Sequence, residues 1–125
     1  MNIYESAEDY LERIYMLSEK MEHVRVTDIA RSMNYSKPSV SIAMKKLLEN
    51  KLINISPNSY ITLTEKGLEI AISVYDRHRI ISSLLIELGV DENIAKDDAC
   101  KIEHDLSDES FNAIKNYYIN VINKK

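Results

Sequence analysis

Cysteine, glycine and proline are all scarce in this 125-residue chain, which holds one Cys, two Gly and two Pro. A single cysteine cannot form an internal disulfide and fits a reducing cytosol. Because glycine and proline are rare, long structureless linkers are not expected and helix should dominate. No apolar run approaches the roughly 20 residues that span a membrane, and no basic segment followed by an apolar stretch opens the chain. We therefore expect a cytoplasmic protein without a membrane partner.

Charge is unevenly distributed along the chain, although the formal net charge is only −4. Residues 25–51 carry six Lys or Arg against two Asp or Glu, whereas residues 97–109 carry six acidic residues against one Lys. A basic middle segment and an acidic later segment indicate two different functions on one chain.

In the first half of the chain, apolar residues recur at helical spacing. They predict a first helix around Tyr10–Leu17, a second over 28–33 and a third that Ser36 caps. Residues 52–55 and 60–63 are typical of two short strands around a turn. This order of two helices, a turn, a third helix and a hairpin is that of a winged helix-turn-helix.

The second half of the chain is predicted to be entirely helical. A long helix should end at Gly89, another should span 92–106, and Ser107 should cap the last. The long helix has more apolar residues than one helix face needs, which indicates a homodimer. The expected fold is mostly α with a small β-hairpin wing: a winged helix-turn-helix over 1–63 and a helical dimerisation domain over 64–125.

The third predicted helix has a polar and basic side opposite its apolar side. That side carries Pro38, Ser41, Ile42, Lys45, Lys46 and Glu49. Hydroxyl and ammonium groups near a helix N-terminus suit DNA phosphates and base edges. An ordinary solvated helix face is the alternative, but the neighbouring short helix and hairpin favour DNA binding. Ile42 is either an ordinary exposed isoleucine or a contact for a thymine methyl group.

The predicted wing contains no Lys or Arg. Its turn offers the hydroxyl and amide groups of Ser56, Asn58 and Ser59. We therefore expect the wing to contribute modestly, through polar and backbone contacts to phosphates.

The segment Cys100-Lys101-Ile102-Glu103-His104 is the most informative stretch of the sequence. On a helix, positions i, i+3 and i+4 lie together, so its thiol, carboxylate and imidazole would form one stripe. Such a mixture suits a transition metal better than Ca²⁺ or Mg²⁺. Asp9 and Glu12 form a similar i, i+3 pair on the first helix, and His78 lies on the long helix.

Each of these residues also has an ordinary explanation. Acidic pairs on helices are mostly solvated, and a lone histidine or cysteine is often a core residue without a ligand. Three helices that each offer ligand-type residues, in a chain already typical of a DNA-binding module, favour a metal site.

Several stretches of the sequence together match one family pattern. They are Ala7–Tyr15, Val26–Ala30, Pro38–Ser41, Leu63–Gly67, Arg77-His78 and Ala99–Ser107. Along nearly its whole length the chain resembles the diphtheria-toxin-repressor and manganese-transport-regulator family of metal-dependent repressors, in its short two-domain form. The helix-turn-helix pieces are weakly specific, whereas the Glu-His pair before Leu-Ser is strongly specific when combined with the Asp9/Glu12 helix.

The resemblance implies a transcriptional repressor that controls metal-ion homeostasis. It would bind double-stranded operator DNA as a homodimer when loaded with Mn²⁺ or Fe²⁺, with Co²⁺ or Zn²⁺ as substitutes in vitro. The family's metal-ligand positions correspond to Asp9, Glu12, His78, Cys100, Glu103 and His104. Its recognition-helix positions correspond to Ser36, Lys37, Pro38, Ser39, Ser41 and Ile42.

The chain combines features of both branches of that family. Asp9 resembles the manganese type, since iron-type members carry a methionine there. Cys100 resembles the iron type, since manganese-type members carry a glutamate there. Ser82 and Lys96 stand where the iron type has a carboxylate and a histidine of its ancillary site.

The implied mechanism is a clamp between the two domains. A bound cation would tie the first helix to the helical half and thereby set two recognition helices about 34 Å apart. One alternative is a winged-helix regulator that responds to a small organic ligand or to none.

An enzyme is the other alternative. A di-iron oxidase needs Glu-x-x-His from two helices, and the chain has no such motif. It also lacks a Gly-rich phosphate loop and a nucleophile–base motif, so we expect neither catalysis nor a small-molecule substrate.

Overall fold

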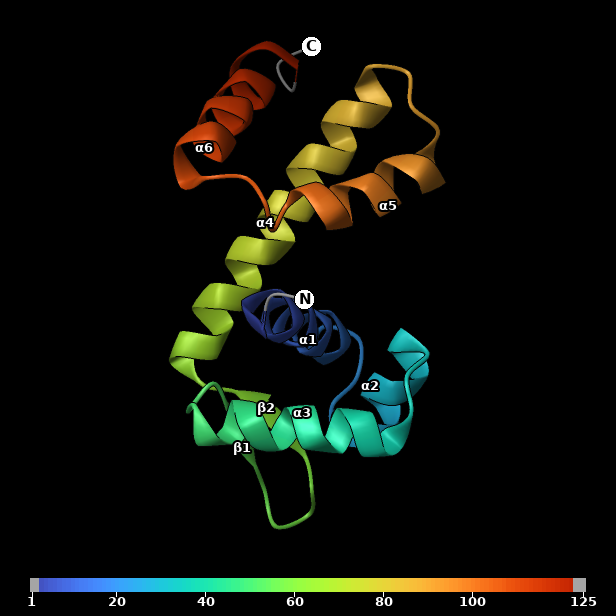
Figure 1. The fold of residues 1–125 in the computed structure, drawn as a ribbon, viewed down its shortest axis with the longest axis vertical. Coiled ribbons are helices and arrows are strands. Elements are labelled where there is room, and N and C mark those ends of the chain that lie inside the picture. Colours follow the sequence, from blue (N-terminus) through green and yellow to red (C-terminus); the bar gives the residue numbers. More distant parts are fainter. Residues whose placement is uncertain (1–2, 123–125) are drawn as a thin grey trace. The chain divides into compact units, whose positions relative to one another are not determined.

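The computed structural model describes residues 3–122 of the chain. Its elements are α1 (Ile3–Ser18), α2 (Val26–Met33), α3 (Lys37–Glu49), β1 (Ile53–Ile55), β2 (Ile61–Leu63), α4 (Glu65–Glu87), α5 (Glu92–Ile102), α6 (Asp108–Tyr117) and a π-helical turn (Tyr118–Ile122) (Figure 1). The predicted fold class, mostly α with one β-hairpin, is confirmed. Within the described part of the chain, no helix combines the length and apolar character needed to cross a bilayer.

Two compact units make up the chain, Met1–Ser73 and Val74–Lys125, and α4 contributes to both. This division of contacts differs from the predicted domain boundary between residues 63 and 64, which is based on where the wing ends. The domain boundary stays a prediction.

The first unit forms around one apolar core to which every one of its helices and strands contributes. The core residues are Leu11, Ile14, Val24, Ile29, Ala30, Val40, Met44, Leu47, Ile53, Ile61 and Ala71. Their helical or alternating spacing brings one side of each element inward. The same spacing leaves the opposite side of α3 exposed to solvent.

The ends of the short elements depend on local capping. Ser36 caps α3 as predicted, because its hydroxyl accepts a hydrogen bond from the backbone N–H of Ser39 at 3.3 Å. By contrast, α2 begins at Val26, two residues before the predicted start at residue 28, and Arg25 occupies its N-cap position. The backbone N–H of Arg25 donates to Asp28 Oδ2 at 2.9 Å, which satisfies a donor outside the helix.

The wing is an antiparallel hairpin in which Ile53 pairs with Leu63 and Ile55 with Ile61. The sequence did not indicate that Val24 forms a bridge on the other side of β2, where the Ile61 N–H donates to the Val24 carbonyl at 2.7 Å. The base of the wing is therefore tied to the segment before α2.

The start of α4 closely approaches the backbone of Leu52, the residue before β1. A Cβ added to Gly67 would lie 2.0 Å from the backbone oxygen of Leu52, so only glycine fits this position. Thr64 lies at the junction as well, since its hydroxyl donates to the Lys51 carbonyl at 2.8 Å and accepts from the Gly67 N–H at 3.1 Å.

The second unit has a smaller apolar cluster, formed by Ile80, Ile81, Ala99 and Phe111. Gly89 has φ 103°, as expected of a glycine that ends a helix. The predicted helix over 92–106 is too long, because α5 ends at Ile102 and a turn follows. Helical spacing with Ala95 and Ala99 predicted that Ile102 faces inward, and this prediction is wrong, since Ile102 is 37% exposed.

Candidate metal centre and nucleic-acid interface

Three side chains of the second unit bring metal-ligand atoms together. His78 lies on α4, Cys100 lies in the last turn of α5, and Glu103 caps that helix. The His78 Nδ1 atom is 3.2 Å from Glu103 Oε2 and 3.4 Å from Cys100 Sγ. One ligand atom from each residue lies within 4.8 Å of the other two. This is a spacing that a single ion could span.

The electrostatics of this cluster favour a cation. The hydrogen bond to Cys100, and after it the hydrogen bond to Glu103, raises the pKa of His78 to about 10, against a smaller opposing effect of burial. The imidazole is therefore the positive partner of the thiol and the carboxylate. A metal ion that takes the same ring nitrogen has to displace its proton.

His104 joins the cluster through Glu103. Its Nε2 atom is 3.5 Å from Glu103 Oε1, and both side chains are almost fully buried. The structure thus brings together four of the six residues that the sequence indicated as metal ligands. Asp9 and Glu12 lie on α1 in the first unit, and their role as ligands stays a prediction.

The donor set of the second unit fits a divalent transition metal. Imidazole and thiolate are ligands of the softer first-row ions, and a carboxylate also accepts Mn²⁺ or Fe²⁺. Ser82 and Lys96, which stand where iron-type members carry two ancillary-site ligands, both have other partners. The Ser82 hydroxyl donates to the Arg79 carbonyl at 3.2 Å, and Lys96 Nζ pairs with Glu92 Oε1 at 3.0 Å. These two side chains do not supply the carboxylate and imidazole of an ancillary metal site.

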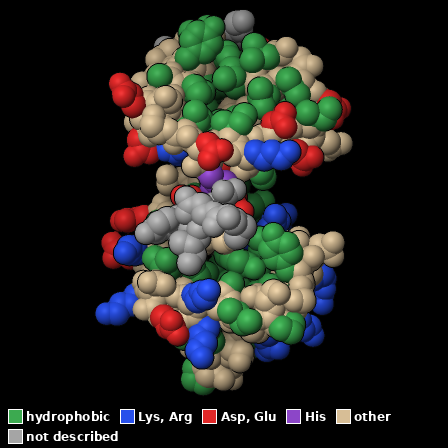
Figure 2. All heavy atoms as spheres, viewed as in Figure 1, with side chains coloured by type: hydrophobic (Ala, Val, Ile, Leu, Met, Phe, Trp, Pro, Cys, Tyr) green, Lys and Arg blue, Asp and Glu red, His purple; other side chains and the backbone are tan. Residues whose placement is uncertain are grey.

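The DNA-facing residues predicted for the third helix are all exposed in the first unit. They are Ser36, Lys37, Pro38, Ser39, Ser41, Ile42, Lys45 and Lys46. Ile42 has 61% of its surface exposed, so it is not a core residue and is available to a partner. Figure 2 shows Lys and Arg side chains spread over the surface of this unit.

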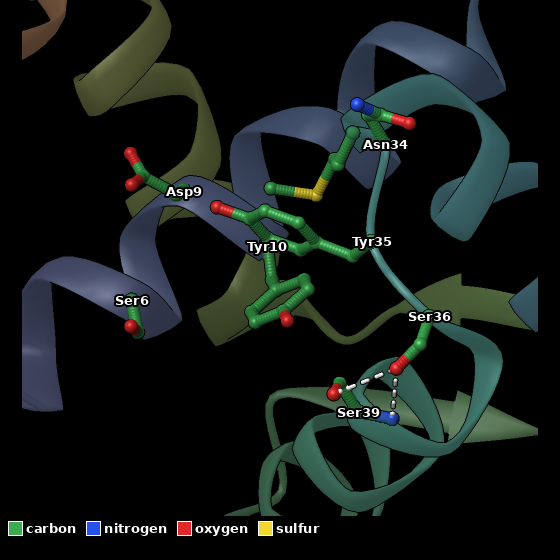
Figure 3. Close-up of a pocket in the computed structure, with 8 residues that line it drawn as sticks. Ser6, Asp9, Tyr10, Asn34, Tyr35, Ser36 and Ser39 are labelled. Carbon is green, nitrogen blue, oxygen red and sulfur yellow. Dashed lines mark hydrogen bonds between the residues drawn. The ribbon is translucent and has the colours of Figure 1, made fainter.

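A cavity of about 480 Å³ lies beside the start of α3 (Figure 3). Its lining residues are Ser6, Asp9, Tyr10, Met33, Asn34, Tyr35, Ser36 and Ser39. The Tyr10 and Tyr35 rings meet edge to face with centroids 6.1 Å apart, and burial followed by the nearby Tyr35 raises the pKa of Tyr10. The cavity therefore combines residues of α1 with the segment that leads into α3.

A positively charged side chain from outside the wing, that of Arg25, lies against the wing residue Tyr60. Arg25 Nη2 donates to the Tyr60 hydroxyl at 3.2 Å, and its guanidinium carbon is 4.8 Å from the centre of that ring. His23 stacks on Tyr60 with centroids 4.0 Å apart. Sequence spacing could not reveal this contact because 35 residues separate Arg25 from Tyr60.

Comparison with known proteins identifies both halves of the chain. A family model described as the N-terminal DNA binding domain of iron dependent repressors matches residues 2–60. A second model, described as their metal binding and dimerisation domain, matches residues 64–121. Both models describe regulatory domains rather than an enzyme.

Whole-chain relatives agree with these models. The chain is 42% identical over 113 residues to an uncharacterised HTH-type transcriptional regulator of Methanocaldococcus jannaschii, covering 89% of this chain and 90% of that protein. It is 37% identical over 109 residues to the HTH-type transcriptional regulator MntR of Bacillus pumilus, covering 87% of this chain and 76% of that protein.

A solved structure of the manganese regulator SloR has the same fold. It superposes with a TM-score of 0.80 at 35% sequence identity, over 89% of this chain and 52% of that chain. The chain thus spans about half the length of this solved structure. With two family models that together match most of its length, the chain belongs to the iron-dependent repressor family, as its resemblance to the diphtheria-toxin-repressor and manganese-transport-regulator proteins predicted.

Proposed function

We propose that this protein is a metal-dependent transcriptional repressor that binds operator DNA as a homodimer when loaded with Mn²⁺ or Fe²⁺. The observation that carries the proposal is the convergence of the His78, Cys100 and Glu103 ligand atoms within 4.8 Å of one another. The manganese regulators among the solved structures that it resembles support Mn²⁺, and the family models name iron. Cytoplasmic location and the absence of membrane or small-molecule partners belong to the same proposal.

The proposed metal ligands are His78, Cys100, Glu103 and His104 in the second unit and Asp9 and Glu12 on α1. A divalent cation supplies positive charge to carboxylate and thiolate groups that would otherwise repel one another. In this scheme residues 1–63 read DNA, and residues 64–125 bind the metal and form the dimer.

The proposed DNA contacts come from the exposed side of α3. Ser36 and Ser39 lie at its N-terminus, where hydroxyl and backbone N–H groups suit phosphates. Lys45 and Lys46 add positive charge further along the helix. One such module reads few base pairs, so two copies are needed for a specific operator.

A homodimer through the second unit is supported by its exposed apolar side chains. Among them are Ile86 in the last turn of α4, Leu88 just after that helix, Ile94 on α5, and Tyr117 at the end of α6. In Figure 2, hydrophobic side chains (green) gather over the surface that α6 and the end of α4 form. Apolar surface of this kind is typical of obligate protein interfaces.

The decisive experiment is a DNA-binding titration with and without metal. Duplexes are first enriched from a random pool on the Mn²⁺-loaded protein, and the enriched duplex is then labelled for fluorescence anisotropy. The protein should bind the duplex at least tenfold more tightly with Mn²⁺, Fe²⁺, Co²⁺ or Zn²⁺ than with a chelator. A change of this size corresponds to the coupling free energies that are usual between two allosteric sites. Equal affinity with metal and with chelator would contradict the proposal and favour a regulator that responds to another ligand or to none.

The matched variants for this titration are His78→Ala and Ile72→Ala. Losing the imidazole should abolish the metal response while metal-free, nonspecific binding stays unchanged. Ile72 lies on the same helix and is exposed in the first unit, so its substitution should leave the metal response intact.

A further inference from the structure

Arg77 makes a set of contacts that neither the metal site nor the DNA surface explains. Its side chain is only 12% exposed although it carries a permanent charge. Arg77 Nη1 donates to the backbone carbonyls of Glu103 at 2.9 Å and Leu106 at 2.8 Å, and Nη2 contacts Asp108. The guanidinium carbon also lies 5.0 Å from the centre of the Phe111 ring.

These contacts hold the turn between α5 and α6. Because α5 ends at Ile102, the carbonyls of the residues that follow have no helical N–H partner. A carbonyl shielded from water without a partner is costly, and one guanidinium satisfies two such part-buried carbonyls. A lysine could not do the same, since its ammonium lacks the planar fork that reaches several acceptors at once.

The position of Arg77 links this turn to the metal-ligand cluster. Arg77 immediately precedes His78 on α4, and the carbonyl it binds belongs to Glu103, whose carboxylate faces the His78 ring at 3.2 Å. The adjacent Asp76 strengthens the same link, since it accepts from Lys115 on α6 at 2.7 Å. Arg77 on α4, the helix that carries the ligand His78, thus holds the backbone of the second ligand, Glu103, by a hydrogen bond.

We propose that Arg77 is a positioning residue for the metal centre, which sets the Glu103 carboxylate and the His104 imidazole relative to His78. The inference rests on the proposed function, because it assumes that this cluster binds a metal. Groups that orient metal ligands from behind commonly contribute 10- to 100-fold in affinity. Without Arg77 the turn still carries Glu103 and His104, but these side chains are less ordered before the metal binds. Ordering them on binding costs free energy and lowers the affinity for the metal.

The test is a Co²⁺ titration of the full-length chain, followed by its visible absorption and repeated with Mn²⁺ by calorimetry. Arg77→Gln should weaken binding of both ions by about 10- to 100-fold and shift the cobalt d–d bands, because the carboxylate ligand moves. Arg77→Lys, which keeps the charge, should restore only part of the affinity. A merely structural role would lower the melting temperature of the metal-free protein without moving these bands.

Arg79→Gln is the matched control. Arg79 lies on the same helix and pairs with Asp76 at 3.1 Å on the exposed side, so its loss should change metal affinity by less than about twofold, as exposed ion pairs contribute little. Asp108→Asn, which leaves both carbonyl contacts in place, should also have a small effect.

Several outcomes would overturn the inference or its basis. Wild-type affinity and an unchanged cobalt spectrum in Arg77→Gln contradict the positioning role. If that variant does not fold, Arg77→Lys decides, and wild-type behaviour there contradicts the role equally. A wild-type protein that binds neither Co²⁺ nor Mn²⁺ contradicts the proposed function itself.

Discussion

The two compact units of the molecule differ in the size of their apolar cores. In the first unit, apolar residues from every helix and strand meet in one core. In the second unit the apolar cluster is small, and the carboxylate of Glu103 is among the most buried groups at 2% exposure, while Leu88 is 71% exposed. Burying a carboxylate is costly unless a cation or hydrogen bonds compensate it.

This difference indicates which unit would gain stability from a bound metal or a partner copy. The first unit has the larger apolar core, although it too buries a carboxylate, that of Glu12 at 8% exposure, and exposes Ile42 on α3. The second unit places ionisable groups inside and apolar groups outside, so a bound metal and a partner copy would both add to its stability. The predictions below test this contrast.

The largest expected effect is the disruption of the first unit by Gly67→Ala. The added Cβ would lie 2.0 Å from the Leu52 carbonyl oxygen, and we expect a loss of about 3 kcal/mol or more in the free energy of unfolding. Thermal or urea unfolding followed by circular dichroism measures it. Gly89→Ala, a strained position with open space around it, should cost only about 1 kcal/mol. A smaller loss at Gly67 than at Gly89 would refute the argument from close approach.

Next in size is the loss of a metal ligand from the second unit. Cys100→Ser should weaken transition-metal binding by about two orders of magnitude and remove the thiolate-to-cobalt charge-transfer band. Affinity of the wild type should rise with pH, because the thiol and the imidazole must lose protons on binding. Cys100→Glu should shift preference from Zn²⁺ towards Mn²⁺. Unchanged affinity in Cys100→Ser would mean that the thiol is a bystander.

The third prediction concerns the apolar exterior of the second unit. Leu88→Glu should raise the dissociation constant of the dimer by tenfold or more, as expected when a charge enters an apolar interface. Ile72→Glu, at a 45% exposed position on the first-unit part of α4, is the control and should leave the dimer intact. Sedimentation velocity across a range of protein concentrations separates the two. A wild-type monomer at micromolar concentration would contradict dimerisation through this surface.

The smallest effects are expected on the DNA-binding surface of the first unit. Lys45→Ala should reduce the slope of log affinity against log salt by about one, without changing which sequence is preferred. Arg25→Ala, which removes the cation held at Tyr60, should reduce the slope by a smaller amount. Lys96→Ala in the second unit should not change it. Equal slopes for Lys45→Ala and wild type would mean that α3 is not the reading helix.

Much of the fold was predictable because its signals are local. Ser36 and Ser107 cap helices through hydrogen bonds to residues three positions away, and such contacts depend only on neighbouring sequence. The end of α5 was predicted four residues too late. Helical spacing continues through Leu106, but the carbonyls beyond Ile102 bind Arg77 instead of helical N–H groups, and this competitor lies on another helix.

The candidate site divides in the same way. The sequence alone determined which residue types could bind a metal and which helix side could face DNA, because those properties follow from side-chain chemistry and from helical periodicity. Only the tertiary structure decided that His78 meets Cys100 and Glu103, that Arg77 holds the turn behind them, and that Arg25 supplies a cation to an uncharged wing. Each of these contacts joins residues more than 20 positions apart. Local patterns cannot specify such pairs, since the packing of whole elements brings them together.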